Sequence, residues 1–135
     1  MSDEDIALLQ ELYPGITEEC VEIVRLEGVQ AMPRDVRDCF VMNRTRRYSG
    51  YWLLDFETSL YCEQTKPECI VGEEGRYVWL TFDDDAKPEV PKDGIYRIEF
   101  TGRRTADIGG FGHEGSADHE VVVEDLITLE AVSPP

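Results

Sequence analysis

Long apolar runs are missing from this chain. No window approaches the ~20 consecutive apolar residues that a membrane-spanning helix needs. The opening segment, MSDEDIALLQELYPG, also lacks the basic start and the apolar centre of a secretory leader. These two absences predict a cytoplasmic protein that does not enter a membrane.

Positive charge is scarce as well. The 135 residues include 13 lysines and arginines against 29 aspartates and glutamates, which gives a net charge of −16. A chain of this charge is repelled by phosphate backbones, so the composition argues against nucleic acid as a partner. It favours a basic partner protein or a cation.

The usual signatures of catalysis and cofactor binding are absent. No G-x-S-x-G, Walker loop or dinucleotide fingerprint occurs, so we predict no cofactor and favour a protein that is not an enzyme. A nucleophile pair of Cys62 with His113 or His119 stays open as an alternative. The run Asp83–Asp85 lacks the residue order of a calcium loop, and we interpret it as a solvated turn.

The cysteines do not form any C-x-x-C pair, so the usual redox and zinc-ribbon spacings are missing. The four are Cys20, Cys39, Cys62 and Cys69. In a cytoplasmic protein we expect all of them to be reduced thiols. If the chain were a mature form from which a leader had been removed, the same argument would predict disulfide bonds instead of reduced thiols.

Alternating apolar residues indicate strands over much of the chain. The segments are 50–58, 76–84, 94–102 and 119–132. In the first, Trp52, Leu54 and Phe56 should share one face, and in the third Tyr96 should lie on the buried face. The last segment should bend near Glu124, where charged residues interrupt its apolar run.

The start of the chain predicts one helix, at about residues 3–13. Ser2 can cap it, acidic residues occupy its first turn, and Pro14 ends it. Residues 17–32 are ambiguous, because the β-branched residues of CVEIVRLEGVQ favour a strand whereas TEEC can begin a second helix. We favour the strand.

These elements together predict the fold class. We expect a single domain over 1–135 that is mainly β: a small antiparallel OB-like barrel at about 17–132, with an N-terminal α-helix and a frayed tail at 133–135.

The last third of the chain also resembles a known pattern. YRIEFTGRRT followed by GGFGHEGSADHEVVVEDLITLEAV is similar to small bacterial proteins of unknown function that carry a G-[YF]-G-H-x-G loop and then an E-x-x-V strand. The matching residues are Gly110, Phe111, Gly112, His113, Gly115, Glu120 and Val123. The resemblance covers roughly the C-terminal two thirds, and it implies an OB-like β-barrel rather than an activity. Many such relatives begin with a lipoprotein-type leader, which this chain lacks.

The segment 109–120, GGFGHEGSADHE, holds both histidines. Its glycines allow positive φ, as a long hairpin connection requires, and we expect His113 to turn inward and to hydrogen-bond the backbone across the loop. The alternative is a metal site made by His113, His119 and Glu120, with Cys62 and Cys69 nearby, because imidazole and carboxylate groups suit a divalent ion. The histidine spacing does not match a helical zinc motif.

Most of the arginines fall into two short stretches. They are Arg34, Arg37, Arg44, Arg46 and Arg47, followed by Arg103 and Arg104. Beside Tyr48, Tyr51 and Phe111 they could line a groove that stacks bases, as OB-folds do. Because carboxylates are so abundant, we favour ion pairs between these arginines and the surplus acids instead.

Three functional hypotheses follow. The first is a non-enzymatic binding module whose protein or small-molecule ligand contacts Arg103, Arg104, Phe111 and His113 and the face that carries Trp52. The second is an acidic inhibitor, such as an immunity protein, that covers a basic partner protein. The third is a metal-dependent enzyme that uses the His113 loop.

Overall fold

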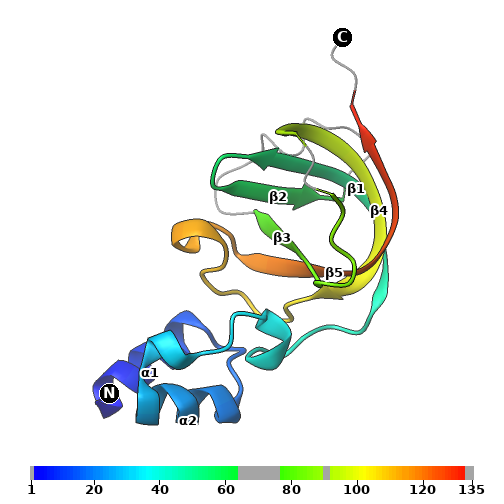
Figure 1. The fold of residues 1–135 in the computed structure, drawn as a ribbon. Coiled ribbons are helices and arrows are strands. Elements are labelled where there is room, and N and C mark those ends of the chain that lie inside the picture. Colours follow the sequence, from blue (N-terminus) through cyan, green and yellow to red (C-terminus); the bar gives the residue numbers. More distant parts are fainter. Residues whose placement is uncertain (1, 64–76, 90–91, 133–135) are drawn as a thin grey trace.

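Five strands close into a barrel in the computed structural model of the protein, which describes residues 2–63, 77–89 and 92–132 (Figure 1). The strands are β1 (Arg46–Asp55), β2 (Thr58–Cys62), β3 (Val78–Phe82), β4 (Gly94–Arg104) and β5 (His119–Ala131). Their order around the barrel is β1-β2-β3-β5-β4, and β1 closes on β4. The predicted mainly β, OB-like barrel is confirmed.

Two details of the predicted barrel are wrong. Among the described strand pairs, β3 and β5 run parallel, whereas the others are antiparallel. The barrel also begins at Arg46 rather than near residue 17, because helices occupy the preceding segment. Cys69 and the predicted tail at 133–135 lie outside the described residues.

The barrel interior is filled by the alternating residues that the sequence pattern indicates. Tyr96, Ile98 and Phe100 of β4 are all buried, and the ring of Phe100 stacks on Tyr48 with the centroids 5.1 Å apart. Phe56 is the exception, since 80% of it is exposed. The expectation that it shares the face of Trp52 and Leu54 is wrong because β1 ends at Asp55 and the chain then turns.

The long strand β5 bends where its charges predict. Its register against β4 shifts at two places, one of which leaves Glu124 as an extra residue between Val123 and Asp125. The bulge lets one strand pair with β4 along most of its length and with β3 at its start. The predicted irregularity near Glu124 is therefore confirmed.

Two helices precede the barrel, not one. The helix α1 (Asp3–Leu12) begins as predicted, since the Ser2 side chain accepts a hydrogen bond from the amide of Asp5. The helix α2 (Glu18–Glu27) replaces the strand that we favoured. The Thr17 side chain accepts a hydrogen bond from the amide of Cys20, so local capping overrides the weak β propensity of the residues that follow.

The helical segment packs on the outside of the barrel (Figure 1). Because successive residues of a strand face opposite sides, Val122 of β5 and Trp79 of β3 point outward while their neighbours fill the interior. They meet Phe40 and Phe111 in a second apolar core. Short 3₁₀ turns at Val29–Ala31 and Val36–Asp38 connect α2 to β1. Neither described helix is long and apolar enough to cross a membrane.

A disulfide joins Cys20 of α2 to Cys39, which follows the second 3₁₀ turn. Cys62 is disulfide-bonded as well. The expectation of reduced thiols is therefore wrong, because folding brings residues without a recognisable spacing to within bonding distance. The bonded state of Cys62 also removes it as a nucleophile or metal ligand. The cytoplasmic location stays a prediction.

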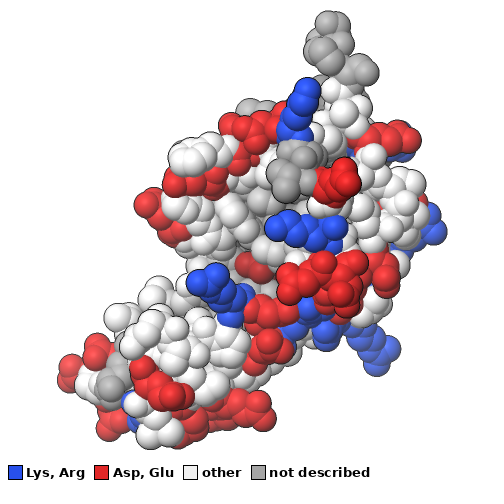
Figure 2. Space-filling view, viewed as in Figure 1, with Lys and Arg blue, Asp and Glu red and all other residues white. Residues whose placement is uncertain are grey.

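The arginines pair with the surplus carboxylates. Arg46 binds Glu63 at 2.8 Å, and Arg47 binds Glu99 across β1 and β4 at 2.5 Å. Figure 2 shows basic side chains mixed among acidic ones on the face of the molecule that it draws. Tyr48 is buried inside the barrel and cannot stack a base at the surface. The favoured interpretation, ion pairs rather than a groove that stacks bases, is confirmed for these pairs.

Candidate ligand-binding cleft

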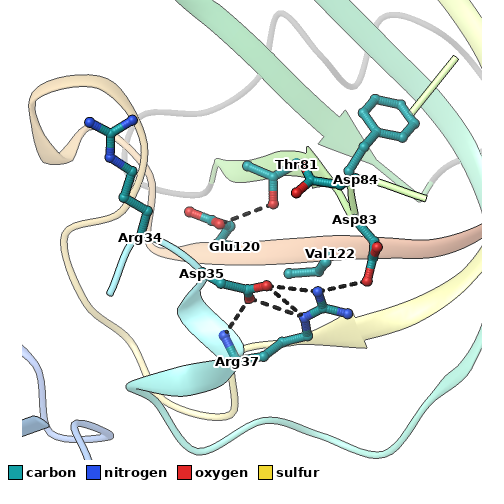
Figure 3. Close-up of a pocket in the computed structure, with 9 residues that line it drawn as sticks. Arg34, Asp35, Arg37, Thr81, Asp83, Asp84, Glu120 and Val122 are labelled. Atoms are coloured by element: carbon teal, nitrogen blue, oxygen red, sulfur yellow. Dashed lines mark hydrogen bonds and ion pairs between the residues drawn. The ribbon is translucent and has the colours of Figure 1, made fainter. Parts of the chain in front are cut away.

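A cleft of about 460 Å³ lies between the outer face of β3 and β5 and the segment 34–37 (Figure 3). Three elements supply its lining: the segment before and within the second 3₁₀ turn, strand β3 with the turn that follows, and the start of β5. The lining residues are Arg34, Asp35, Arg37, Thr81, Phe82, Asp83, Asp84, Glu120 and Val122.

Glu120 is the central polar group of the cleft. Strand alternation points its side chain away from the barrel interior, and the helical segment then covers it, so only 8% of the residue is exposed. Its Oε2 accepts a hydrogen bond from Thr81 Oγ1 at 3.1 Å. No described residue donates a hydrogen bond to Oε1, and Figure 3 shows the carboxyl directed into the cleft.

The buried position of Glu120 changes its acidity. Burial raises the pKa of its carboxyl to about 7, and nearby Asp35 acts in the same direction. The hydrogen bond from Thr81 lowers the pKa, but by less than burial raises it. Glu120 therefore changes its charge near neutral pH, unlike a carboxyl in water.

Arg37 forms one wall of the cleft and holds three carboxylates together. Its guanidinium binds Asp35 at 2.7 Å, Asp83 at 2.8 Å and Glu124 at 3.0 Å, and only 16% of its side chain is exposed. The hydrogen bond from Arg37 is the main cause that lowers the pKa of Asp35. Since these partners occupy its donors, Arg37 shapes the cleft rather than presenting a free charge to a ligand.

Arg34 stands on another side of the cleft. It forms no ion pair with any residue that the structure describes. Figure 3 shows its guanidinium extending away from the Arg37 network. The cleft thus combines one positive side chain at its margin with a protonatable carboxyl in its depth.

Removing Arg37 tests whether its ion pairs hold the cleft in shape. We expect Arg37→Ala to lower the free energy of unfolding by about 2 kcal/mol, less than for a fully buried pair because its partners are partly solvated. Urea denaturation measures the change. Arg47→Ala is the control, since 64% of the Arg47 side chain is exposed and its pair with Glu99 should contribute little. Equal losses in the two variants would contradict the role given to Arg37.

The residues predicted to contact a ligand do not form one surface. Trp52 is 3% exposed inside the barrel, where its Nε1 donates to Ser59 Oγ at 2.8 Å. Phe111 is 5% exposed and packs against Phe40. Arg103 binds Glu124 at 3.2 Å, and Arg104 is a half-buried residue at the end of β4. The two aromatic side chains are therefore part of the cores and are not available at the surface.

The two histidines have different surroundings. The prediction that His113 turns inward is wrong: 42% of its side chain is exposed, and its Nε2 lies 3.1 Å from Glu57 Oε2. His119 makes the inward contact instead, with Nδ1 3.1 Å from the carbonyl oxygen of Thr105. Burial, and then the charge of Arg104, lower the pKa of His119.

The metal alternative needs His113, His119 and Glu120 to converge. Each of the three has a different neighbour: Glu57, Thr105 and Thr81 respectively. Within residues 2–63, 77–89 and 92–132, no group of three metal-ligating side chains gathers. The described geometry therefore offers no assembled site for the metal-dependent enzyme.

The glycine-rich loop is conformationally demanding at one position. Gly112 has a φ of +75°, and a Cβ there would lie 2.4 Å from Cε3 of Trp79. We expect Gly112→Ala to lower the free energy of unfolding by about 2 kcal/mol, because backbone strain and the contact with Trp79 act together. Thermal unfolding measures the change. Gly110→Ala is the matched control, since a Cβ at Gly110 meets no atom closer than 3.6 Å. A Gly112→Ala variant as stable as this control would contradict the prediction.

Sequence reasoning did not connect Thr81 with Glu120. Both lie at outward-facing positions of segments that the alternation identifies as strands, and this signal was available. Their proximity depends on the parallel pairing of β3 with β5, in which Trp79 lies opposite Glu120 and Thr81 opposite Val122. Neither the pairing nor the cover provided by the segment 34–37 has a local sequence pattern.

Comparisons of the chain with protein-family models, with curated proteins and with solved structures found no match.

Proposed function

We propose that this protein is a non-enzymatic binding module whose ligand occupies the cleft between the segment 34–37 and strands β3 and β5. The observation that carries the proposal is Glu120, a carboxyl that is nine-tenths buried, is directed into the cleft and has one oxygen without a described donor. The free oxygen opens onto the cleft, where water satisfies it in the absence of a ligand. A ligand in the cleft replaces that water with its own hydrogen-bond donor.

The composition of the cleft favours binding over catalysis. A mechanism of acid–base or nucleophilic type needs a second reactive group within hydrogen-bond reach. The lining residues that the structure describes include neither histidine nor cysteine, and Arg37 is engaged by three carboxylates. The cleft does hold other carboxylates, but the described hydrogen bond of the Glu120 carboxyl is to Thr81 and not to any of them. A volume of about 460 Å³ falls within the range of small-molecule sites.

We also infer a relation to the small bacterial OB-like proteins that the C-terminal part of the chain resembles. Glu120 belongs to the residues that carry this resemblance, as does the glycine-rich loop around Gly112. The barrel fold supports the relation without identifying a ligand, because barrels of this kind host many functions.

A second candidate is the acidic inhibitor of a basic partner protein. It is favoured by the charge of the helical segment, where α1 and α2 each carry four carboxylates and Arg25 is the only basic residue of the two helices. Such a surface steers a basic protein towards it at low ionic strength. This candidate predicts salt-sensitive binding that is lost when carboxylates of the helices, rather than Glu120, are replaced.

The binding proposal can be tested by nuclear magnetic resonance on the ¹⁵N-labelled protein. The probes are butylammonium, guanidinium, acetate, phosphate and glucose, which differ in charge and hydrogen bonding. We expect at least one of them to cause saturable shifts of the amides of Thr81 and Glu120, while the amide of Ile98 inside the barrel stays unchanged. If none of the five shifts the amides of the cleft, the proposal is wrong.

A further inference from the structure

We propose that the cleft binds the primary ammonium group of an alkylamine, with Oε1 of Glu120 as its main acceptor. This inference rests on the proposed function and specifies its ligand. A free polyamine and a lysine side chain present the same chemical group, and the experiment below separates them.

The acceptors of the cleft match the donors of an ammonium ion. An ammonium has three N–H donors and no acceptor. Oε1 of Glu120 receives no hydrogen bond from a described residue, and the Thr81 hydroxyl keeps lone pairs after donating to Oε2. Asp84 lines the same cleft from the turn after β3 and forms no ion pair with a described residue. These oxygens come from β5, β3 and the following turn.

The charges of the cleft favour a cation. Asp35, Asp83, Asp84 and Glu120 face two arginines across it. The positive charge of Arg37 is already balanced by Asp35, Asp83 and Glu124, which leaves Arg34 as the opposing charge at the margin. The whole chain, at −16, adds a long-range attraction for cations.

The geometry at Glu120 favours ammonium over guanidinium. A guanidinium binds a carboxylate best when two parallel N–H groups reach both oxygens. At Glu120 one of those oxygens, Oε2, already accepts from Thr81, which leaves it one further lone-pair site for a second N–H group. A compact point charge that needs a single oxygen is therefore the better fit.

Binding of a cation should depend on the charge of Glu120. The charged and polar groups that face it are Arg34, Asp35 and Arg37 from one side and Thr81, Asp83 and Asp84 from the other. Since burial raises the pKa of Glu120 to about 7, the carboxyl is mostly protonated at pH 6 and mostly ionised at pH 8. A cation that needs the ionised form must displace the proton, so its apparent affinity should rise about tenfold over this interval.

Isothermal titration calorimetry at pH 6 and pH 8 tests the inference, with cadaverine as the free amine and Nα-acetyl-lysine-N-methylamide as the side-chain mimic. We expect binding that is about tenfold tighter at pH 8, and proton release at pH 6 that is detected as a dependence of the heat on the buffer. Glu120→Gln should abolish binding, and Thr81→Val should weaken it. Glu99→Gln, which changes a carboxylate of β4 outside the cleft, should leave binding unchanged.

The outcomes distinguish a free amine from a lysine side chain as the ligand. They also distinguish a failure of the ammonium inference from a failure of the binding proposal. Binding of cadaverine alone identifies a free amine as the ligand, whereas equal binding of the lysine mimic identifies a side chain of a partner. Affinity that falls from pH 6 to pH 8, or binding that survives in Glu120→Gln, overturns the ammonium assignment. If acetate, phosphate or glucose shifts the amides of the cleft while neither amine binds, this inference fails and the binding proposal stands. If no probe binds, both fail.

Discussion

Replacing both Cys20 and Cys39 with alanine is expected to lower the free energy of unfolding by about 3 kcal/mol, which corresponds to a melting temperature lower by about 10 °C. The two cysteines are 19 residues apart, and their bond restricts the unfolded chain over that distance. In the native state it ties α2 to the segment that leads into β1, and both cysteines are buried in the second apolar core. Its loss therefore affects the elements that cover the cleft.

Thermal unfolding followed by circular dichroism measures this effect. The control is Glu19→Ala, an exposed substitution on α2 that should shift the melting temperature by no more than about 1 °C. Mass spectrometry of the alkylated native protein reports whether Cys20 and Cys39 are bonded in the purified wild type. A double variant as stable as the wild type would show that the bond does not stabilise this fold.

Replacing Glu120 with glutamine should make the protein more stable at pH 8, by about 3 kcal/mol, and leave it unchanged at pH 4. The folded state raises the pKa of Glu120 from 4.5 to about 7 because the carboxyl is buried. Between these values the native state binds more protons than the unfolded chain, so this carboxyl makes the wild type less stable as the pH rises. Glutamine keeps the hydrogen-bonding shape of the protonated acid and carries no charge at any pH.

Urea denaturation of the wild type and of Glu120→Gln at pH 4, 6 and 8 measures this dependence. The difference between the two proteins isolates the effect of Glu120. The other carboxylates, which are paired with arginines, contribute less stability as the pH falls and they become protonated, and this effect is common to both proteins. Glu99→Gln is the control, and its difference from the wild type should not grow between pH 6 and pH 8. A Glu120→Gln variant that gains no stability at pH 8 would mean that the carboxyl is not held in a buried site.

The parts of the fold that could be predicted are those that depend on neighbouring residues. The alternation of Tyr96, Ile98 and Phe100 identified the interior face of β4, since each position of a strand alternates between core and solvent. Ser2 marked the start of α1 for an equally local reason, a side chain that bonds an amide three residues ahead. Local rules failed where two of them gave opposite predictions. At residues 18–27 the β-branched residues favour a strand, but the N-cap at Thr17 favours a helix, and the segment forms α2.

The site depends on contacts between distant segments. The histidines near Glu120 in the chain suggest a metal ligand as the alternative, yet its hydrogen-bond partner is Thr81, 39 residues away. His113 lies 3.1 Å from Glu57 of the β1–β2 turn, nearer than the 3.8 Å to Glu114 of its own loop. The aromatic side chain of Trp52 suggests a ligand contact, but the barrel interior buries it.

The sequence by itself determined the mainly β class, the first helix, the faces of the strands and the acidic charge. These properties follow from composition and from periods of two or about four residues, which are short-range. The tertiary structure alone decided that β3 and β5 lie parallel, that Cys20 meets Cys39 and that the segment 34–37 covers Glu120. Each of these depends on which distant surfaces pack together, and that packing converts an outward-facing carboxyl into a buried one whose charge changes near neutral pH.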